Sequence, residues 1–484
     1  MQTRRHFLRA GFGAAALLAA GRELPLLAAD TTADATPASS FTSKRPPIGE
    51  RRFQSDAVEA KIVEMRGRIG DPELAWMFEN CYPNTLDTAV DFKEIDGKPD
   101  TFVITGDIDA MWLRDSSAEV WQYLPLAKSD PKLNRLLQGV IRRQSQCILL
   151  DPYANAFLAD PNGKSEWSGD YTVLKPGIHE RKWEIDSLCY PIRLAHGYWK
   201  ETGDAAPFDA QWESAMETVL RTFREQQRKD GKGPYYFLRE GVKPEPNAPI
   251  PDPAYGPAVK PNGLICSRFR PSDDETTYQF LIPSNFFAAV SLHQMAEMLD
   301  QIRGNHKLAS QASALGREVE KALQKYAKQT YPTQGAVYAY ELDGLGNVSL
   351  TDEATNTPSL LSLPYLGATP VSDPIYQGTR RLVWSRDNPW FFEGKYTGVG
   401  GPHTGRNQIW PIATMMYGLT STSEAEVTAC LQTLKATHAG TGFMHESFNK
   451  NDASRFSRPW FAWANSLFGE FVIQTTDRFP KALG

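Results

Sequence analysis

The feature that most limits the fold of this sequence is a long succession of helix-like segments with no linker between them. In residues 131–150, 209–228 and 285–302, apolar residues recur at the spacing of a buried helix face. Strand-like alternation is limited to 101–105 and 336–342. The sequence therefore predicts an all-α fold. Further helical segments are expected at 55–69, 115–127, 187–201, 308–328, 357–364, 408–418, 423–436 and 460–475.

The helices carry no coiled-coil heptad, so they must bury their apolar faces on one another within one domain. A double ring of helices, with each inner helix flanked by outer ones, satisfies this requirement. In such a ring alternate loops converge on one end, where a rigid scaffold can position functional side chains. The polar, aromatic-rich segments between the helices are 104–115, 166–186, 267–278, 384–406 and 440–460.

The N-terminal fifty residues differ in composition from the rest of the chain. Arg4 and Arg5 precede a short run of Ala, Gly and Leu, which is the layout of a twin-arginine export signal over residues 1–29. Residues 30–50 are rich in Thr, Ala, Ser and Pro, which is typical of a flexible tether. Residues 51–484 show no low-complexity break and no repeat, so we expect a single domain there.

The export signal predicts a periplasmic or extracellular protein. Its apolar run is too short and too rich in Gly and Ala for a good membrane span, so we expect no stable membrane insertion after the signal is removed. An uncleaved membrane anchor is the alternative. Twin-arginine export usually carries folded proteins, which fits an odd number of cysteines that we expect to be buried thiols. They are Cys81, Cys147, Cys189, Cys266 and Cys430.

Charge and histidine content argue against two classes of protein. The net charge of −5 is the wrong sign for a nucleic-acid partner. Eight histidines without a closely spaced ligand pair predict no metal site, and the absence of a phosphate-binding glycine loop predicts no cofactor. "DIDAM" at 107–111 begins like a calcium loop, but Met111 and Trp112 stand where a carboxylate or amide and a glycine are needed.

The segments between the helices mix aromatic residues with carboxylates, arginines and histidines. Aromatic faces suit the C–H faces of sugar rings, and charged groups hydrogen-bond hydroxyls in fixed directions. Nucleic-acid sites also use aromatic rings, but with an excess of Lys and Arg that these segments lack. The composition therefore indicates a carbohydrate site. The clearest segments are "WSGDY", "ERKWEID", "SRFRPSDDETTY", "WSRDNPWFFEGKY" and "TGFMHESF".

Hydrolysis of a glycoside needs one protonated and one ionised carboxyl group. The neighbours Asp273 and Asp274 can repel each other, so that one of them stays protonated. Glu446 lies among aromatic residues, where partial burial can tune its pKa. For any of these carboxylates the alternative is a helix cap or a solvated surface charge. The candidate carboxyls are Asp107, Asp109, Asp115, Asp186, Asp273, Asp274, Glu393 and Glu446.

Ten segments together resemble, in order, those of glycoside hydrolase family 125, from about residue 55 to 475. The segments are "TFVITGDIDAMWLRDS", "DPYANAF", "ERKWEIDSLCYPI", "FRPSDDE", "LIPSNFFA", "YAYELDGLGN", "PSLLSLPYLG", "IWPIA", "GTGFMHESF" and "SRPWFAWANSLFGE". The resemblance implies a single catalytic domain that is an (α/α)6 barrel with minor β-hairpins in its loops. It also implies an exo-acting, metal-independent α-mannosidase that hydrolyses non-reducing terminal α-1,6-linked mannose of oligomannosides or glycans and inverts the anomeric centre.

The same resemblance assigns roles to individual residues. It makes Glu446 the general base and Asp273 the general acid, with Asp274 as the second choice. The aspartate that is not the acid is expected to hold Arg270 or a sugar hydroxyl. Arg114 and Asp115 are expected to clamp neighbouring mannose hydroxyls, and a structural Arg–Asp pair that locks two helices is the alternative. Residues expected to contact the α-mannoside are Trp112, Arg114, Asp115, Asp186, Asp274, Trp384, His403, Arg406 and His445.

Three other functions remain open from the sequence: a different glycosidase on the same barrel, such as an α-glucosidase, a phosphorylase or an endo-acting mannanase; a non-catalytic glycan-binding protein; and a calcium-dependent mannosidase. One departure from the family is the segment 244–261, which holds seven prolines and looks longer than usual. As a stiff loop it could narrow the leaving-group side of the site, or it could be a harmless surface loop.

Overall fold

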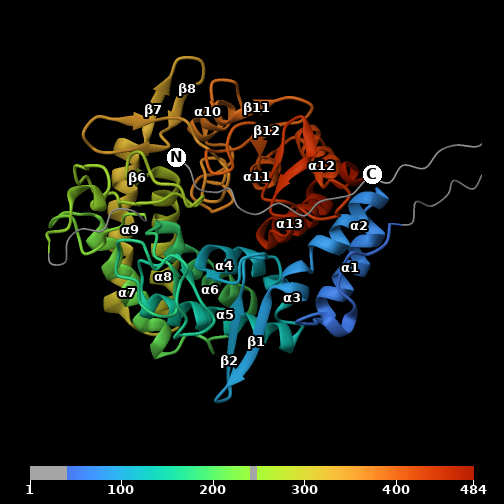
Figure 1. The fold of residues 1–484 in the computed structure, drawn as a ribbon, viewed down its shortest axis with the longest axis horizontal. Helices are drawn as coiled ribbons and strands as arrows, with labels where there is room; N and C mark the ends of the chain where they lie inside the picture. Colours follow the sequence, from blue (N-terminus) through green and yellow to red (C-terminus); the bar gives the residue numbers. More distant parts are fainter. Residues whose placement is uncertain (1–40, 240–247) are drawn as a thin grey trace, which may run out of the picture. The chain divides into compact units, whose positions relative to one another are not determined.

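The computed structural model describes residues 41–239 and 248–484, and Phe41–Gly484 form one compact unit (Figure 1). The predicted export signal, the tether up to residue 40 and residues 244–247 of the proline-rich segment lie outside the described residues. None of the helices in the two described ranges combines the length and the hydrophobicity that crossing a bilayer demands.

The described residues form thirteen α-helices, so the expected helix-rich fold is confirmed. The helices are α1 (Asp56–Arg68), α2 (Pro72–Cys81), α3 (Asn84–Thr88), α4 (Leu113–Trp121), α5 (Pro131–Leu150), α6 (Ile185–Thr202), α7 (Ala210–Gln226), α8 (Ile282–Gln301), α9 (His306–Tyr326), α10 (Pro374–Val383), α11 (Pro411–Leu419), α12 (Glu424–Thr437) and α13 (Ala462–Arg478).

Helix α5 shows how the sequence directs this packing. Its N-cap Asp130 accepts hydrogen bonds from the backbone N–H groups of Lys132 and Leu133, and Pro131 occupies the first turn, where no N–H partner is needed. The apolar stripe predicted from the sequence is fully buried against β2 (Lys98–Val103), α6 and α7. The polar face remains outside, so α5 is held mainly by its tertiary contacts.

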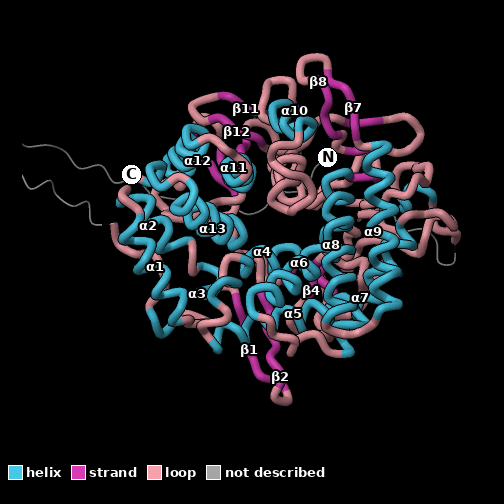
Figure 2. The backbone as a smooth tube through the Cα atoms, turned by 180° about the vertical axis from the view of Figure 1, so that it is seen from behind, coloured by secondary structure: helices cyan, strands magenta, loops and turns pink. Residues whose placement is uncertain are grey.

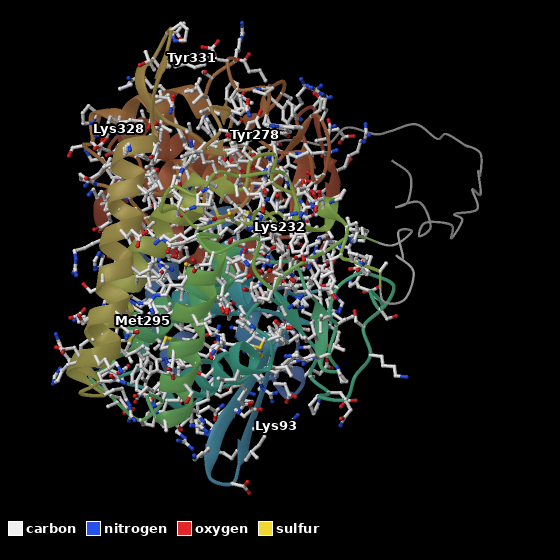
Figure 3. All side chains as sticks on the ribbon, turned by 90° about the vertical axis from the view of Figure 1, so that its left-hand side faces the viewer. Lys93, Lys232, Tyr278, Met295, Lys328 and Tyr331 are labelled. Atoms are coloured by element: carbon white, nitrogen blue, oxygen red, sulfur yellow. The ribbon has the colours of Figure 1, made fainter. Side chains whose placement is uncertain are left out.

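The helices pack on one another in two layers. Helices α13, α4, α6 and α8 contact each other in that order, and α11 packs against α13. A second set lies outside them: α9 runs along α8, α7 packs on α5 and α9, and α12 packs on α11 (Figure 2). In the side view of Figure 3, Met295 of α8 lies buried between the layers, whereas Lys93 is exposed on the hairpin of β1 (Val90–Ile95) and β2.

The helix expected at 357–364 is absent, and the segment consists of turns. Pro358 and Pro364 cannot donate the backbone hydrogen bonds of a helix. The Ser362 hydroxyl instead accepts from the Ser359 N–H and donates to the Ser359 carbonyl, both at 2.8 Å. The leucines of this segment are buried, so their pattern reflected burial and not a helical period. Helices α2, α3 and α10 were not predicted from the sequence.

The strands are short and lie almost entirely in the connections between helices. The strand expected at 336–342 is split, because β8 pairs with β7 whereas β9 pairs with β6 and β10. The sheets of the described residues are β1–β2; β3 (Met111–Trp112), β4 (Ala156–Phe157) and β5 (Ile178–Glu180); β6 (Phe280–Leu281), β9 (Glu341–Leu342) and β10 (Val348–Ser349); β7 (Lys328–Tyr331) and β8 (Gly335–Tyr338); β11 (Phe391–Glu393) and β12 (Thr397–Val399); and β13 (Gln408–Ile409), β14 (Ser447–Asn449) and β15 (Asp452–Ser457).

Residues 41–50 pack on the helical unit, although their composition predicted part of a tether. The ring of Phe41 stacks on Trp76 with centroids 5.0 Å apart. Arg45 is hydrogen-bonded to Asp87 at 2.8 Å and to Glu59 at 2.5 Å. The stacked ring of Phe41 and the buried guanidinium of Arg45 hold the segment on the helices. Composition is an average over the whole segment, so it does not reveal the few residues that make such contacts.

Candidate active site

The short sheet β3–β4–β5 lies next to the first turns of the inner helices α4 and α6. In β3–β4–β5, the strand β3 runs directly into α4, and β5 precedes α6 by a few residues. Because α4 and α6 pack against each other, the first turns of the two helices are neighbours. These turns carry Arg114 and Asp186, both of which the resemblance assigned to the substrate site.

Arg114 is the centre of a buried acidic cluster. Its Nη1 lies 2.5 Å from Glu184 Oε2 and 3.1 Å from Asp186 Oδ2. Its Nη2 lies 3.4 Å from Asp273 Oδ1, and its Nε lies 3.5 Å from Asp115 Oδ2. Four carboxyl groups therefore surround one guanidinium that is only 3% exposed. We call Arg114 and these four residues the Arg114 cluster.

Asp115, a member of the cluster, and its near neighbour in the sequence Trp112 make further contacts. Asp115 Oδ1 accepts a hydrogen bond from the Thr105 hydroxyl at 2.5 Å. The Trp112 ring packs edge-on against His179 with centroids 5.3 Å apart, and its indole N–H has no hydrogen-bond partner among the described residues. A buried donor without a partner is costly, which is a common property of sites that bind a polar ligand.

The side chains of Asp273 and Asp274 diverge from a tight turn. The Asp273 N–H bonds the Arg270 carbonyl at 2.9 Å, and the Arg270 N–H bonds the Asp274 carbonyl at 2.8 Å. Asp273 has a φ of +66°, and its side chain reaches Arg114 and the Asn155 amide, whose Nδ2 is 3.5 Å away. Asp274 points to His403 instead, with 3.3 Å between Oδ1 and Nδ1.

The turn also excludes the helix-cap alternative for Asp273. The next helix, α8, begins only at Ile282 after strand β6, and its N-cap is Leu281. The expected pairing of Arg270 with an aspartate side chain is wrong; its Nε and Nη1 bind Glu341 at 2.6 Å and Glu353 at 3.1 Å. These ion pairs fix the turn, so that the two neighbouring carboxylates are held apart.

Glu446 immediately precedes β14 and is held by residues of the neighbouring strand. Its Oε2 accepts from the Ser457 hydroxyl at 2.9 Å, and its backbone N–H donates to the Ser457 carbonyl at 3.3 Å. Arg458 Nη1 lies 4.0 Å from Oε1. Arg458 also binds Asp107 through Nε at 2.7 Å, so the end of strand β15 connects Glu446 to the segment that carries the Arg114 cluster.

His403 links the three candidate carboxylates. Burial opposes protonation of its imidazole, but the hydrogen bond and charge of Asp274 and the charges of Glu446 and Asp273 together raise the pKa of His403 above its ordinary value. All three carboxylates therefore act on one imidazole ring. The charges of the candidate acid and the candidate base thus act on the same imidazole, although the two residues lie far apart in the sequence.

Three expected substrate residues have other surroundings. Trp384 stacks on Tyr417 at 4.1 Å between ring centroids, on the α10–α11 side. Arg406 is exposed, with its guanidinium 5.8 Å from the centre of the Trp390 ring. His445 is buried and stacks on Phe456 at 3.7 Å, and burial lowers the pKa of its imidazole. In the described ranges, no contact joins these three side chains to the Arg114 cluster.

Several residues that contact the expected ones were not predicted from the sequence. Glu184 is fully buried on Arg114, Asn155 Nδ2 lies 3.3 Å from Glu180 and 3.5 Å from Asp273, and the charge of Lys182 acts on Asp273. A signal was present in "ERKWEID", because a segment with so many charged residues can be buried only if the charges have partners. The sequence did not indicate which charged residues share a partner.

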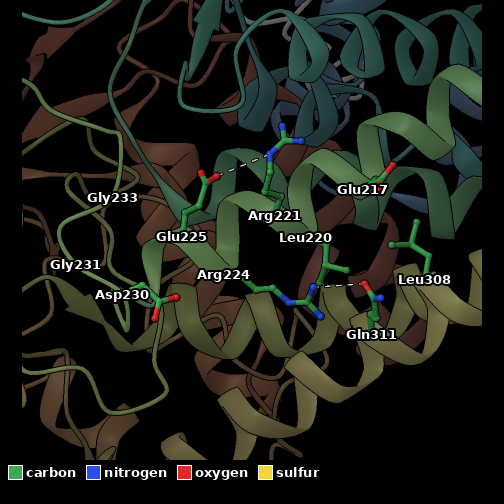
Figure 4. Close-up of a pocket in the computed structure, with 10 residues that line it drawn as sticks. All are labelled: Glu217, Leu220, Arg221, Arg224, Glu225, Asp230, Gly231, Gly233, Leu308 and Gln311. Atoms are coloured by element: carbon green, nitrogen blue, oxygen red, sulfur yellow. Dashed lines mark hydrogen bonds and ion pairs between the residues drawn. The ribbon is translucent and has the colours of Figure 1, made fainter.

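Other features of the described chain lie apart from this cluster. The cavity of about 440 Å³ in Figure 4 runs between α7 and α9 and contains none of the predicted site residues. Within residues 41–239 and 248–484, no three His, Cys, Asp or Glu side chains are placed to share a metal ion. The five cysteines are buried free thiols, as expected.

The part of the proline-rich segment that is described packs on its surroundings. The Ala254 carbonyl accepts from the Phe237 N–H at 2.9 Å, and the Lys260 N–H donates to the Asp343 carbonyl at 2.9 Å. Gln279 hydrogen-bonds the Pro257 carbonyl through its side chain. Residues 248–261 are thus held on the outside of the segment that leads to β6, close in sequence to Asp273.

Comparison with known proteins identifies the family of the chain. The family described as "Metal-independent alpha-mannosidase (GH125)" matches residues 71–473. A Schizosaccharomyces pombe protein, "Meiotically up-regulated gene 157 protein", is 38% identical over 460 residues, which cover 91% of this chain and 89% of that protein.

Solved structures give the same result. A Streptococcus pneumoniae metal-independent α-mannosidase, determined in a non-productive complex with α-1,6-mannobiose, superposes with a TM-score of 0.83 at 41% identity. It covers 88% of this chain and 99% of its own. Another solved glycosidase has a TM-score of 0.51 at 11% identity, with 84% and 96% of the two chains covered, and shows a likeness of fold alone. The chain belongs to glycoside hydrolase family 125, the metal-independent α-mannosidases.

Proposed function

We propose that this protein is an exo-acting, inverting α-mannosidase that removes non-reducing terminal α-1,6-linked mannose from oligomannosides or glycans without a metal ion. Membership of the family and the α-1,6-mannobiose bound by the S. pneumoniae relative support this proposal. The observation that carries it is the contact of Asp274 with His403 at 3.3 Å, on an imidazole whose pKa is also raised by the charges of Glu446 and Asp273.

Glu446 acts as the general base in this proposal. It accepts a proton from a water molecule that attacks C1 of the terminal mannose, while Ser457 holds its carboxylate by a hydrogen bond of 2.9 Å. Asp273 acts as the general acid and gives its proton to the departing glycosidic oxygen, with Asp274 as the alternative. Inversion requires the two carboxyls to stand roughly 6.5–9.5 Å apart, so that the water fits between the base and C1.

The Arg114 cluster binds the terminal mannose. A sugar offers only hydroxyl groups, so a site selects it by paired hydrogen bonds of fixed direction in a dry pocket. Asp115 and Asp186 are held by the Arg114 guanidinium and supply acceptors, and Trp112 contributes an apolar wall with a free indole N–H. His403 orients Asp274 for the same sugar. In this proposal Trp384, Arg406 and His445 do not contact the terminal mannose and only support the residues around it.

The two layers of helices form an (α/α)6 barrel in this proposal. The inner ring consists of α4, α6, α8, α11 and α13, and the buried turns at 357–367 take the sixth position between α8 and α11. The Thr357 carbonyl accepts from Tyr190 of α6 at 2.9 Å, and the Leu361 carbonyl accepts from Tyr376 of α10 at 2.9 Å. Those two contacts support a place for this segment beside the inner helices.

The N-terminal sequence supports a second proposal, on location. A twin-arginine signal over residues 1–29 would carry the folded enzyme across the inner membrane to the periplasm or beyond. Replacement of Arg4 and Arg5 by lysine should leave the mannosidase activity in the cytoplasmic fraction, and unchanged export of this variant would contradict the proposal.

The deciding experiment is proton NMR of mannose released from α-1,6-mannobiose. The β-anomer should appear first, because water attacks from the face opposite the α-linkage. The α-anomer as first product would contradict inversion, and turnover of glucosides or internal linkages instead would favour another glycosidase. A protein that binds mannobiose without releasing mannose would be a glycan-binding protein.

A further inference from the structure

We propose that Glu184 is a positioning residue that shares one proton with Asp273, so that the two carboxyl groups form a dyad which supplies the general acid with its proton. The inference rests on the proposed function and deepens it. It assigns a role to a buried acidic residue that the mechanism above leaves unused, and it favours Asp273 over Asp274 as the acid.

Both carboxyl groups lie on the same guanidinium. Glu184 Oε2 is 2.5 Å from Nη1 of Arg114, and Asp273 Oδ1 is 3.4 Å from Nη2. The two Nη atoms of a planar guanidinium are joined to one carbon, so groups bound to them are held side by side. Each of the two carboxyl groups acts on the other, because Asp273 raises the pKa of Glu184 whereas Glu184 lowers the pKa of Asp273. Two ionised carboxylates on one guanidinium repel each other and can only accept hydrogen bonds, so a hydrogen bond between them requires a proton on one of them.

The surroundings decide which carboxyl holds the proton at rest. Glu184 is fully buried; its Oε2 accepts from Arg114 and from the Ser187 hydroxyl at 2.9 Å, whereas its Oε1 accepts from no donor among the described residues. Asp273 retains 22% exposure of its side chain and faces the positive charge of Lys182 as well as that of Arg114. The proton therefore rests on Glu184, and Oε1 is the oxygen available to carry it.

Electrostatics agree with this placement. Burial raises the pKa of Glu184 well above its ordinary value, and the negative charges of Asp273 and Asp186 act in the same direction against the pull of Arg114. Burial also acts to raise the pKa of Asp273, but Lys182, Arg114, the hydrogen bond from Glu184 and His403 together hold it below its usual range. One proton is shared by the pair and belongs to neither residue alone.

The charges that face the dyad come from every element packed around it. Arg114 and Asp115 lie on α4, Asp186 lies on α6, Lys182 precedes α6, and His403 faces Asp273 from the segment before β13. Lys182 is also 3.2 Å from Glu180, so its charge is only partly available. Four carboxylates around one guanidinium leave an excess of negative charge, which the shared proton relieves.

In the catalytic step the site gives one proton to the leaving group and takes one proton from the attacking water. The proton moves from Glu184 to Asp273 and then to the glycosidic oxygen, as the bond from C1 to that oxygen breaks and takes its electron pair with it. The attacking water forms the new bond to C1 and gives its own proton to Glu446. Solvent afterwards returns the proton from Glu446 to the dyad, and Arg114 holds both carboxylates while they are ionised.

Glu184→Gln tests the dyad because glutamine keeps the size and the acceptor for Arg114 but carries no transferable proton. On α-1,6-mannobiose, kcat/KM at neutral pH should fall about 100-fold, the low end of general acid catalysis. The alkaline limb of its pH profile should move to lower pH, because Asp273 loses a proton-sharing neighbour. With 2,4-dinitrophenyl α-mannoside, whose leaving group needs little protonation, the loss should stay under about tenfold.

Two further variants separate the dyad from a structural role. Asp186→Asn changes a carboxyl on the same guanidinium with the same burial, and it should slow both substrates by one factor without moving the alkaline limb. Ser187→Ala removes the hydroxyl donor to Glu184, which should raise the pKa of the dyad and move the alkaline limb to higher pH. Glu184→Gln and Ser187→Ala are expected to move the alkaline limb in opposite directions, so Ser187→Ala still tests the dyad if Glu184→Gln folds poorly.

The outcomes divide cleanly. If both substrates slow equally in Glu184→Gln and neither this variant nor Ser187→Ala moves the alkaline limb, Glu184 only anchors Arg114 and the dyad is wrong. If the wild-type protein hydrolyses no α-mannoside, the proposed function fails and the dyad fails with it. An active wild-type enzyme with shifted limbs and a spared dinitrophenyl substrate supports both.

Discussion

The two sides of the site treat their carboxylates in opposite ways. On the α4–α6 side, four carboxyl groups crowd around Arg114 in a buried cluster, and burial there raises the pKa of Asp186 to about 6. On the β13–β14–β15 side, Glu446 stands with a hydroxyl donor from Ser457 and a guanidinium 4.0 Å away. The first environment raises the pKa of Glu184 and Asp186, whereas the second surrounds its carboxylate with a hydrogen-bond donor and a cation, and this contrast suits an acid on one side and a base on the other.

The largest effect should come from the base side. Glu446→Gln removes the group that accepts the water proton, so kcat on α-1,6-mannobiose should fall by about 10⁴-fold, while binding of mannose measured by calorimetry persists. Glu393→Gln is the matched control, because Glu393 is an exposed carboxylate paired with Arg386 at the surface. If the activity of Glu446→Gln stays within tenfold of wild type, Glu446 is not the base and the contrast between the two sides of the site is wrong.

The acid side should separate its two aspartates. Asp273→Asn should slow mannobiose hydrolysis by about 10³-fold and spare 2,4-dinitrophenyl α-mannoside, because only the poor leaving group needs the proton. Asp274→Asn keeps a polar side chain beside His403 and should affect both substrates alike through binding. The reverse pattern would identify Asp274 as the acid and place the dyad proposal in error.

The cluster itself should depend on its single cation. Arg114→Ala leaves Glu184, Asp186 and Asp273 buried without their common partner, which costs about 3–5 kcal/mol and corresponds to a loss of at least about 100-fold in kcat/KM. Arg135→Ala, which removes an exposed pair with Glu94, is the control and should leave kcat/KM unchanged. A change of less than tenfold for Arg114→Ala would favour the purely structural Arg–Asp pair.

A smaller effect should distinguish the hydroxyl on the base side. Ser457→Ala removes the hydroxyl donor that holds the Glu446 carboxylate, so kcat/KM on α-1,6-mannobiose should fall by about tenfold. Ser454→Ala on the same strand removes a hydroxyl that bonds the exposed Asp452, and it serves as the control. An unchanged kcat/KM in Ser457→Ala would show that Ser457 has no effect on Glu446.

The smallest effect concerns stability. The pKa of His403 is raised in the folded protein, so the stabilisation that its protonation gives is complete below the unfolded pKa of about 6.5 and is lost as pH rises through the folded value. Wild-type Tm should therefore fall between about pH 6 and pH 8 by about 2 °C more than the Tm of His403→Gln. Equal changes in the two proteins would contradict the Asp274–His403 contact.

The sequence predicted an element correctly where its pattern of apolar residues fits only one kind of structure. The apolar stripe of α5 is a buried helix face, because a period of 3.6 residues over about twenty residues fits a helix and does not fit a strand. Prediction failed at 357–364, where leucines are buried in turns and prolines remove the helical hydrogen bonds. Residues 41–50 have the composition of a tether, yet Phe41 and Arg45 contact the helical unit.

By itself the sequence determined that this chain is a helix-rich family 125 protein, and it named most of the residues that meet at the site. Only the tertiary structure decided how the charges are shared: that Glu184 and Asp273 lie on one guanidinium, that Asp274 turns away to His403, and that Trp384 and His445 stack elsewhere. The reason is that residue type sets which chemistry a side chain can do, whereas its protonation and partner depend on burial and on distances of a few ångströms between distant segments.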